Sequence, residues 1–256
     1  MKVVILAGGR GTRMGEITDV RPKPLVEIGG RPILWHVMKI YSSFGFNDFV
    51  VCLGYRGYMI KEWFANHAQH TSDVTFDMTT GECIFHRREM EPWRVTLVDT
   101  GDATLTGGRL LRAVDYLGNA PFLMTYGDGV GNVDIAALLA YHHAHGRLAT
   151  VTAVRPPARY GELDLAGDEV QRFKEKPPET SGYVSGGFFV LSPRVLSYIE
   201  GDDTAWEEGP LSALALEHQL KAYFHSGFWH AMDTVRDRDT LDGMCFDGSP
   251  PWRTWE

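Results

Sequence analysis

Short apolar runs alternate along the chain with segments in which apolar residues recur every three to four positions. The runs have the length of buried strands, and the periodic segments have the length of amphipathic helices. Predicted strands cover Val3–Leu6, Phe49–Leu53, Val95–Val98, Phe122–Tyr126, Ala149–Val154, Val170–Phe173 and Val184–Leu191. Predicted helices cover Ile33–Tyr41, Tyr58–Asn66, Gly107–Leu117, Ile135–His145 and Trp206–His218. This alternation predicts βαβ units and a mainly parallel sheet.

The fold class predicted from this order is α/β, a Rossmann-like mixed and mainly parallel sheet flanked by helices. No repeat or linker interrupts the 256 residues, so we expect a single domain. Residues 73–93 lack clean periodicity and are predicted to form a hairpin excursion. The tail over residues 248–256, which contains Trp252 and Trp255, is a candidate for packing on a neighbouring molecule.

Composition narrows the class of protein. Hydrophobic residues make up 44% and charged residues 23%, and no apolar run reaches membrane-spanning length. The formal net charge of -8 disfavours nonspecific binding to nucleic acid. The chain begins with a core strand instead of a signal sequence, and Cys52, Cys83 and Cys245 are too few and too far apart for a disulfide framework. We therefore expect a cytoplasmic protein with no membrane and no nucleic-acid partner.

A glycine-rich loop directly follows the first strand, in Leu6-Ala7-Gly8-Gly9-Arg10-Gly11-Thr12-Arg13. Glycines allow the backbone to approach a ligand closely, and successive N–H groups can cradle an anion. Arg13 and Lys23 add positive charge beside it. The Gly-Gly-x-Gly spacing matches neither the P-loop nor the dinucleotide fingerprint. The loop is therefore predicted to be a phosphate-binding loop of a different kind from these two.

Two aspartates are candidate metal ligands. Asp128 lies between Gly127 and Gly129 at the carboxyl end of a predicted strand, where open α/β sheets bind ligands. The simpler interpretation is an Asp-Gly turn. Asp233 precedes Thr234, and its simpler interpretation is a helix N-cap. Mg²⁺ prefers hard oxygen ligands and often takes only one or two carboxylates, so these residues suit it.

A second group of residues suits a sugar phosphate. Lys176 can neutralise a phosphate while Glu175 accepts hydrogen bonds from hydroxyls, although a solvated charge pair is equally compatible with the sequence. Gly186 follows Ser185 in a strand, where glycine often marks a bulge or a close ligand. Gly161 is a further candidate, with a simple turn as its alternative.

Other chemistries lack support in the sequence. The histidines at 142, 143 and 145 have no metal-binding spacing, and their place late in a helix accounts for them through the helix dipole. No nucleophile elbow is present, so covalent catalysis by Ser or Cys is not predicted. A glycine loop after an N-terminal strand would also suit an NAD(P)-dependent oxidoreductase, but the required glycine spacing is missing.

With these residues in hand, the chain resembles the sugar-1-phosphate nucleotidyltransferases. It is most similar to the branch that transfers a cytidylyl group from CTP to glucose 1-phosphate. The resemblance covers essentially the whole chain and is carried by residues 22–30, 32–36, 91–93, 98–101, 106–109, 126–129 and 251–256. It implies Mg²⁺ as cofactor, CTP and a sugar 1-phosphate as substrates, and a homo-oligomer.

The resemblance also implies roles for individual residues. Residues 1–130 would mainly bind the nucleotide, and residues 131–247 mainly the sugar phosphate. The implied nucleotide-binding residues are Leu6, Ala7, Gly8, Gly9, Gly11, Thr12, Arg13, Lys23, Thr104, Arg109 and Gly127. The implied sugar-phosphate residues are Gly161, Glu175, Lys176, Ser185 and Gly186. Asp128 and Asp233 would hold the metal, and the catalytic residues would be Arg13, Lys23 and Lys176.

One departure bears on specificity. Ser185 stands where the family commonly has Asn, which shortens a side chain that would face the sugar. Alternatives that remain open are the same chemistry with another sugar 1-phosphate or with UTP or dTTP, and a regulator that binds a nucleotide sugar without catalysis.

Overall fold

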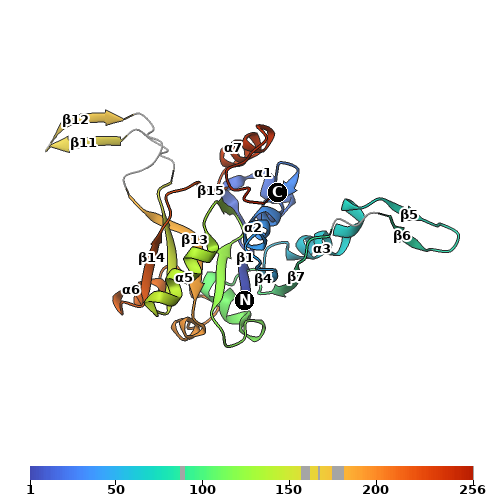
Figure 1. Ribbon diagram of the computed structural model, residues 1–256, viewed down its shortest axis with the longest axis horizontal. Helices are drawn as coiled ribbons and strands as arrows, with labels where there is room; N and C mark the ends of the chain where they lie inside the picture. The colour runs from blue at the N-terminus through green and yellow to red at the C-terminus, as the bar shows by residue number, and fades with distance from the viewer. Residues whose placement is uncertain (87–89, 157–161, 167, 175–181, 256) are drawn as a thin grey trace.

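The computed structural model describes residues 1–86, 90–156, 162–166, 168–174 and 182–255. Within these residues, a seven-stranded sheet forms the centre of the molecule (Figure 1). Its order is β14 (Leu220–Phe224), β10 (Ala149–Val154), β13 (Val184–Leu191), β8 (Phe122–Tyr126), β1 (Lys2–Leu6), β4 (Asp48–Leu53) and β7 (Arg94–Asp99). β13 runs antiparallel to both of its neighbours, and the other pairings are parallel. The predicted mixed, mainly parallel sheet is confirmed.

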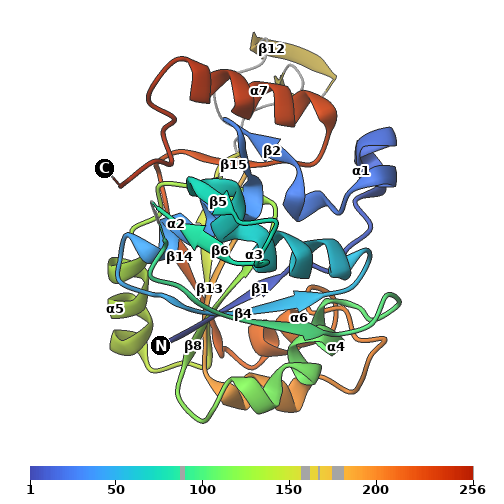
Figure 2. The ribbon, with the colours of Figure 1, turned by 90° about the vertical axis from the view of Figure 1, so that its right-hand side faces the viewer.

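Alternate residues of the central strands enter two hydrophobic cores, one on each face of the sheet. In β1, Val3 and Ile5 pack on one face, and Val4 and Leu6 pack on the other. Because both faces are buried, the strand is an unbroken apolar run. One face is covered by α2 (Ile33–Ser42), α3 (Gly57–Thr71) and α5 (Ile135–His145), and the other by α4 (Thr106–Arg112), η4 (Pro193–Tyr198) and α6 (Pro210–Leu216). α7 (Val235–Phe246) lies farther from the sheet, above β2 (Glu27–Ile28), as Figure 2 shows.

Short elements connect these layers or stand out from them. The connections include η1 (Thr12–Met14), α1 (Glu16–Val20), η2 (Lys23–Leu25), β2 (Glu27–Ile28), β3 (Arg31–Pro32), η3 (Val114–Tyr116), β9 (Gly129–Gly131) and β15 (Trp229–Ala231). Two hairpins extend away from the sheet, β5 (Val74–Phe76) with β6 (Cys83–Phe85), and β11 (Glu162–Ala166) with β12 (Glu169–Lys174) (Figure 1). The hairpin predicted within residues 73–93 is therefore present.

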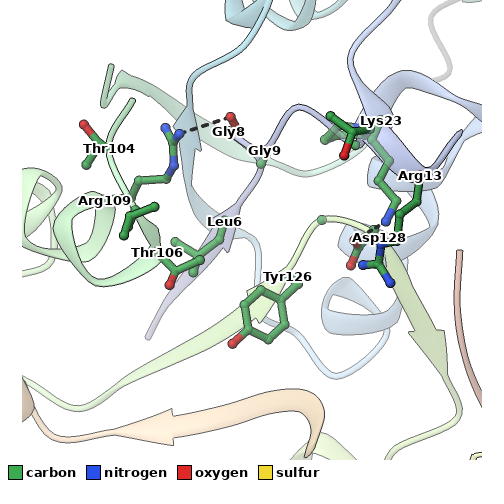
Figure 3. Close-up of a pocket in the computed structure, with 16 residues that line it drawn as sticks. Leu6, Gly8, Gly9, Arg13, Lys23, Thr104, Thr106, Arg109, Tyr126 and Asp128 are labelled. Carbon is green, nitrogen blue, oxygen red and sulfur yellow. Dashed lines mark hydrogen bonds and ion pairs between the residues drawn. The ribbon is translucent and has the colours of Figure 1, made fainter. Parts of the chain in front are cut away.

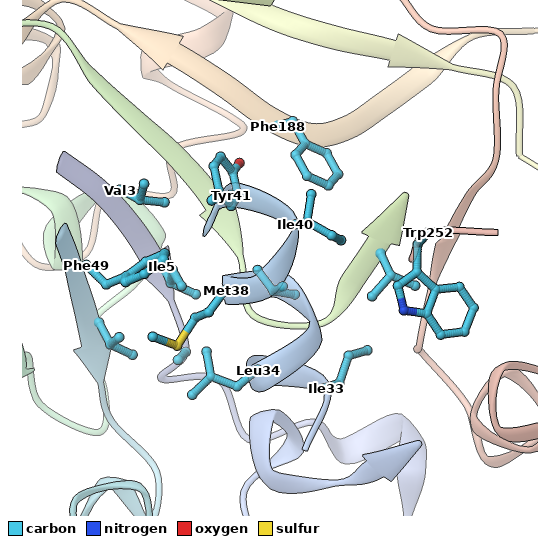
Figure 4. Packing of buried hydrophobic residues seen from close by; sticks show 14 of the residues in the cluster. Val3, Ile5, Ile33, Leu34, Met38, Ile40, Tyr41, Phe49, Phe188 and Trp252 are labelled. Carbon is cyan, nitrogen blue, oxygen red and sulfur yellow. The ribbon is translucent and has the colours of Figure 1, made fainter. Parts of the chain in front are cut away.

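Helix α2 packs directly on the sheet with a continuous apolar face. Its buried side chains meet those of β1, β4 and β13 (Figure 4). Tyr41, for example, stacks on Phe188 of β13 with ring centroids 5.8 Å apart. The C-terminal tail completes this core, because Trp252 is fully buried in its own chain. Trp252 therefore packs within its own chain, and contact of the rest of the tail with a neighbouring molecule stays a prediction.

Trp252 is held through His36 of α2. The indole Nε1–H of Trp252 donates to His36 Nδ1 over 3.3 Å, and His36 Nε2 donates to the Ile28 carbonyl over 2.8 Å. This pattern requires the neutral ring with its proton on Nε2. Burial agrees with it, because desolvation lowers the pKa of His36 to about 4.

Two predicted helices are shorter than expected. The segment predicted as Gly107–Leu117 ends its α-helix at Arg112, where Ala113 N–H is shared between two carbonyls and the chain tightens into η3. The segment predicted as Trp206–His218 becomes helical only at Pro210. Proline lacks an N–H and is favoured in the first turn, so the preceding residues form turns instead.

The histidines at the end of α5 also differ from expectation. His142 is buried and its Nδ1 lies 2.8 Å from the Thr150 hydroxyl. Burial lowers the pKa of His142 to about 4. A neutral ring gains little from the helix dipole, so the electrostatic explanation is wrong for this residue.

No helix in the described part of the chain is long and apolar enough to cross a bilayer.

Candidate active site

The site forms where the order of the parallel strands changes direction. β1 pairs with β4 on one side and with β8 on the other, so the loops after β1 and β8 diverge above it. Two hydrogen bonds extend the ladder into these loops, from Gly127 N–H to the Leu6 carbonyl and from Ala7 N–H to the Cys52 carbonyl, both 3.0 Å. The glycine loop and the Gly127–Asp128 turn are therefore neighbours at the carboxyl edge of the sheet.

A pocket of about 360 Å³ opens at this edge (Figure 3). The structure brings together in its lining every residue predicted to bind the nucleotide: Leu6, Ala7, Gly8, Gly9, Gly11, Thr12, Arg13, Lys23, Thr104, Arg109 and Gly127. Asp128 also lines it. Sequence reasoning missed four lining residues, which are Pro24, Leu105, Thr106 and Tyr126. Each lies within or beside a segment that carries the resemblance, which is the signal that could have found them.

The glycines of the loop serve different purposes. A Cβ on Gly8 would lie 2.1 Å from Arg109 Nη1, so this glycine makes room for a side chain of the protein and not for a ligand. Gly11 has φ of +64°, a conformation that glycine adopts without strain. At Gly9 a Cβ would meet nothing within 4 Å, so only this position leaves open space beside the backbone.

Arg109 holds the backbone at one end of the pocket in place through hydrogen bonds. Its side chain is only 4% exposed and extends from α4 toward the glycine loop. Nη1 and Nη2 donate, over 2.7–3.1 Å, to the Thr100 hydroxyl and to the carbonyls of Gly8, Leu53 and Gly101. Burial lowers the pKa of Arg109 below its usual value. The guanidinium is thus committed to holding backbone in place beside the pocket.

An ionic cluster lies at the end of the pocket opposite Arg109 (Figure 3). Lys23 Nζ lies 2.7 Å from Asp128 Oδ2 and 3.0 Å from Asp233 Oδ1. Arg13 Nη2 lies 2.8 Å from the same oxygen of Asp233. The Lys23 side chain is 9% exposed, so its ammonium is largely withdrawn from water. Both predicted metal ligands therefore converge on one point, although 105 residues separate them.

Strand pairing explains this convergence. β9 begins directly after Asp128, and β15 ends two residues before Asp233. The two strands pair antiparallel with Ala231 opposite Gly129, and Met232 N–H donates to the Asp128 carbonyl over 2.8 Å. The N-cap interpretation of Asp233 is wrong, because Thr234 caps α7 in a capping box with Asp237. The carboxylate of Asp233 instead contacts Arg13 and Lys23, which line the pocket.

The donor set fits a hard divalent cation that a ligand helps to hold. Asp128 and Asp233 supply carboxylate oxygens on either side of one cationic nitrogen. The described residues contain no group of three or more His, Cys, Asp or Glu side chains suited to a metal ion. Two carboxylates completed by phosphate oxygens and water are the usual environment of Mg²⁺.

The residues predicted for the sugar phosphate are only partly described. Gly161, Glu175 and Lys176 lie outside the described residues. Ser185 is exposed on β13, and the Gly186 carbonyl accepts a hydrogen bond from Trp229 Nε1 over 2.7 Å. The ladder between β10 and β13 shifts register at this point, which agrees with a bulge, one of the two interpretations of Gly186, and does not test the other, a close ligand. In the described residues, one pocket of this α/β protein is thus lined by a glycine loop, cations and one carboxylate, and a second carboxylate contacts two of these cations.

Comparison with known proteins identifies the family. The nucleotidyl transferase family profile matches residues 2–233, and the chain belongs to this family. A glucose-1-phosphate cytidylyltransferase from Salmonella typhimurium is 53% identical over 257 residues, covering 100% of both chains. A probable glucose-1-phosphate cytidylyltransferase from Bacillus subtilis is 44% identical over 256 residues, again covering 100% of both. Members of the family generally use a divalent metal ion.

Solved structures agree on the fold. A putative glucose-1-phosphate thymidylyltransferase from Bacillus anthracis superposes with a TM-score of 0.69 at 20% identity, covering 97% of this chain and 96% of that one. A UDP-glucose pyrophosphorylase in complex with UDP-glucose superposes with a TM-score of 0.70 at 15% identity, covering 97% and 99%. At these identities the likeness concerns the fold alone.

Proposed function

We propose that this protein transfers a cytidylyl group from CTP to glucose 1-phosphate, forming CDP-glucose and pyrophosphate. The observation that carries the proposal is the placement of Lys23, whose ammonium contacts both Asp128 and Asp233 at one end of the pocket that the glycine loop lines. The full-length similarity to a glucose-1-phosphate cytidylyltransferase supports the choice of both substrates.

The reaction needs little covalent chemistry from the protein. A phosphate oxygen of glucose 1-phosphate attacks the α-phosphorus of CTP, and the bond to the bridging oxygen of pyrophosphate breaks. The nucleophile is already an anion at neutral pH, so no strong general base is required. The enzyme must instead align two polyanions and neutralise their charge.

The chain's own groups are suited to that work. The backbone of Leu6 to Gly9 would bind the base, and Gly11, Thr12 and Arg13 would surround the triphosphate. Lys23 would contact the reacting phosphates, and Arg13 would stabilise the departing pyrophosphate. Thr104 and Arg109 shape the end of the pocket assigned to the base.

Mg²⁺ would be held by Asp128 and Asp233, where it would offset phosphate charge and orient the α-phosphate. Lys176 would bind the sugar phosphate and Glu175 the sugar hydroxyls, with Gly161, Ser185 and Gly186 beside them. These roles rest on the resemblance. The division into a nucleotide part, residues 1–130, and a sugar part, residues 131–247, remains a prediction.

We also propose that the protein acts in the cytoplasm as a homo-oligomer. The free thiols of Cys52, Cys83 and Cys245 suit a reducing compartment.

The alternative substrates have one observation in their favour. A mannose-1-phosphate guanyltransferase from Schizosaccharomyces pombe is 32% identical over 96% of this chain and 64% of its own, so this chain is also related to a protein named for another base and another sugar. A regulator without catalysis is disfavoured, because Arg13, Lys23, Asp128 and Asp233 are all present around the pocket.

The test is a pyrophosphate-release matrix that combines CTP, UTP, dTTP, ATP and GTP with several sugar 1-phosphates, with and without Mg²⁺. We expect activity with CTP and glucose 1-phosphate that requires the metal ion. Activity with a different pair would reassign the specificity, and no release in any combination would refute the enzymatic function.

A further inference from the structure

A segment from the second half of the chain supports the pocket wall formed by α4. The carbonyl of Asp202 accepts from Leu105 N–H over 2.8 Å, and the carbonyl of Thr204 accepts from Gly107 N–H over 2.9 Å. These are N–H groups at the start of a helix, which have no partner within the helix itself. Residues 202–207, named here the 202–207 strap, therefore satisfy the beginning of α4.

The glycine pair of α4 exists for this contact. A Cβ on Gly107 would lie 2.7 Å from the Thr204 carbonyl oxygen, and a Cβ on Gly108 would lie 2.6 Å from Asp202 Cα. Any side chain at either position would push the strap away. Trp206, fully buried in the core beneath, anchors the strap independently of its charged residues.

One carboxylate at the end of the strap links two walls of the pocket. Glu207 Oε2 accepts from the Thr106 hydroxyl over 2.6 Å, and Glu207 Oε1 accepts from the Tyr126 hydroxyl. Thr106 belongs to α4 and Tyr126 ends β8, and both line the pocket, whereas Glu207 does not. Hydrogen bonds to a charged acceptor are stronger than those between neutral groups.

Tyr126 is thereby fixed at both ends. A Cβ on Gly187 of β13 would lie 2.8 Å from Tyr126 Cδ2, so the ring packs tightly against this strand. At its other end, the Tyr126 hydroxyl donates to the Glu207 carboxylate. In Figure 3 the ring lies between Thr106 and Asp128, and so between the two ends of the pocket.

We propose that Glu207 is a positioning residue for the nucleotide pocket. Its carboxylate holds the Thr106 and Tyr126 hydroxyls apart at a set spacing, so that α4 and the end of β8 are arranged for the nucleotide before it binds. Preorganised walls lower the ordering cost of binding. The proposal rests on the proposed function, since it assigns the pocket to the nucleotide.

The first test compares Glu207→Ala with Glu207→Gln and wild type in steady-state kinetics. We expect the KM for CTP to rise about tenfold in Glu207→Ala, equivalent to about 1.4 kcal/mol. The KM for glucose 1-phosphate should change less than about twofold, since Glu207 lies on the nucleotide side of the pocket. Glu207→Gln keeps one acceptor oxygen and should be intermediate. The control is Glu208→Ala, an exposed neighbour, which should match wild type.

A double-mutant cycle separates positioning from direct contact with the ligand. In a Thr106→Val, Tyr126→Phe background the two hydroxyls are gone, so Glu207→Ala should have no further effect on equilibrium CTP binding. A full effect in that background would mean that Glu207 contacts the nucleotide itself, which overturns the proposal. An unchanged KM for CTP in Glu207→Ala also overturns it.

These outcomes differ from a failure of the proposed function. If the wild-type protein neither binds CTP in calorimetry nor releases pyrophosphate from it, the function is wrong. If wild type does both and Glu207→Ala does so equally well, only the role of Glu207 is wrong. Thermal unfolding of each variant, expected within a few degrees of wild type, identifies a loss of folding.

Discussion

Lys23 occupies the position between the two carboxylates that would hold the metal ion. Its Nζ lies 2.7 Å from Asp128 and 3.0 Å from Asp233, and Arg13 contacts Asp233 from the other side. A divalent ion that binds between these carboxylates has to displace the ammonium. Replacing Lys23 with Met removes the competing charge and keeps an apolar side chain of similar length. We therefore predict that Lys23→Met binds the ion more tightly when no nucleotide is present.

The magnitude follows from the exposure of the partners. The carboxylates of Asp128 and Asp233 are 31% and 20% exposed, so each contact is partly screened by water. Two unit charges about 3 Å apart interact by roughly 1.4 kcal/mol in a water-like dielectric and by several times more in a buried one. Because Arg13 still competes for Asp233 in the variant, we count only one of the two Lys23 contacts, at the water-like value. Losing roughly 1.4 kcal/mol of competition corresponds to an affinity for the ion about tenfold higher.

The assay is titration with Mn²⁺ followed by the electron paramagnetic resonance signal of the free ion, without nucleotide. The control is Lys39→Met, which removes an ammonium 3.0 Å from Glu91 outside the site and should leave Mn²⁺ binding unchanged. A non-hydrolysable CTP analogue gives Lys23 a new anionic partner, so it should tighten Mn²⁺ binding more in wild type than in Lys23→Met. If Lys23→Met binds Mn²⁺ no more tightly than wild type does, Lys23 does not compete with the ion for Asp128 and Asp233.

Three further predictions concern other parts of the molecule. Asp128→Asn should lower kcat at least about 100-fold with the folded structure retained, and wild-type turnover in that variant would exclude Asp128 as a metal ligand. Arg109→Lys should lower the free energy of unfolding, measured by urea titration, by about 2–4 kcal/mol, because it breaks a buried hydrogen-bond network. The control is Arg112→Lys at an exposed ion pair, which should lower that free energy by less than about 1 kcal/mol. Equal losses would contradict the anchoring role of Arg109. In the folded protein His36 is neutral, with a pKa of about 4 instead of 6.5. As the pH falls below 6.5, His36 is therefore protonated in the unfolded chain before it is protonated in the folded one. The free energy of unfolding should fall by about 2 kcal/mol between pH 7 and pH 5 because of this residue. His36→Gln should lose that part of the pH dependence and the exposed His143→Gln should keep it, and an unchanged slope in His36→Gln would contradict the assignment.

The central strands could be predicted because a strand that is buried on both faces has an unbroken run of apolar residues in the sequence. The predicted strands Val3–Leu6 and Phe49–Leu53 agree on this basis with β1 and β4 to within one residue at each end. The helix predicted from Trp206 failed because Trp206 is apolar for a different reason, namely that it anchors the 202–207 strap on the core. Periodicity reports that a residue is buried and not which element carries it.

The residues predicted to bind the nucleotide line one pocket, but the sequence did not predict how they are arranged there. The sequence marked Asp128 and Asp233 as candidate metal ligands, but their meeting depends on the pairing of β9 with β15, which no local pattern encodes. Gly8 was explained by ligand approach, and the structure explains it by Arg109, which lies 101 residues away. Long-range contacts of this kind decide why a glycine is needed, and a sequence alone indicates only that one is present.

The proposed function requires that the pocket at the carboxyl edge of the sheet binds a nucleoside triphosphate. A crystal structure with Mg²⁺ and a non-hydrolysable CTP analogue tests this directly. We predict the base against the backbone of Leu6 to Gly9, and the phosphates beside Arg13 and Lys23 with the ion on Asp128 and Asp233. A nucleotide bound elsewhere, such as in the groove of about 440 Å³ lined by Arg31, Trp35 and Trp255, would contradict it.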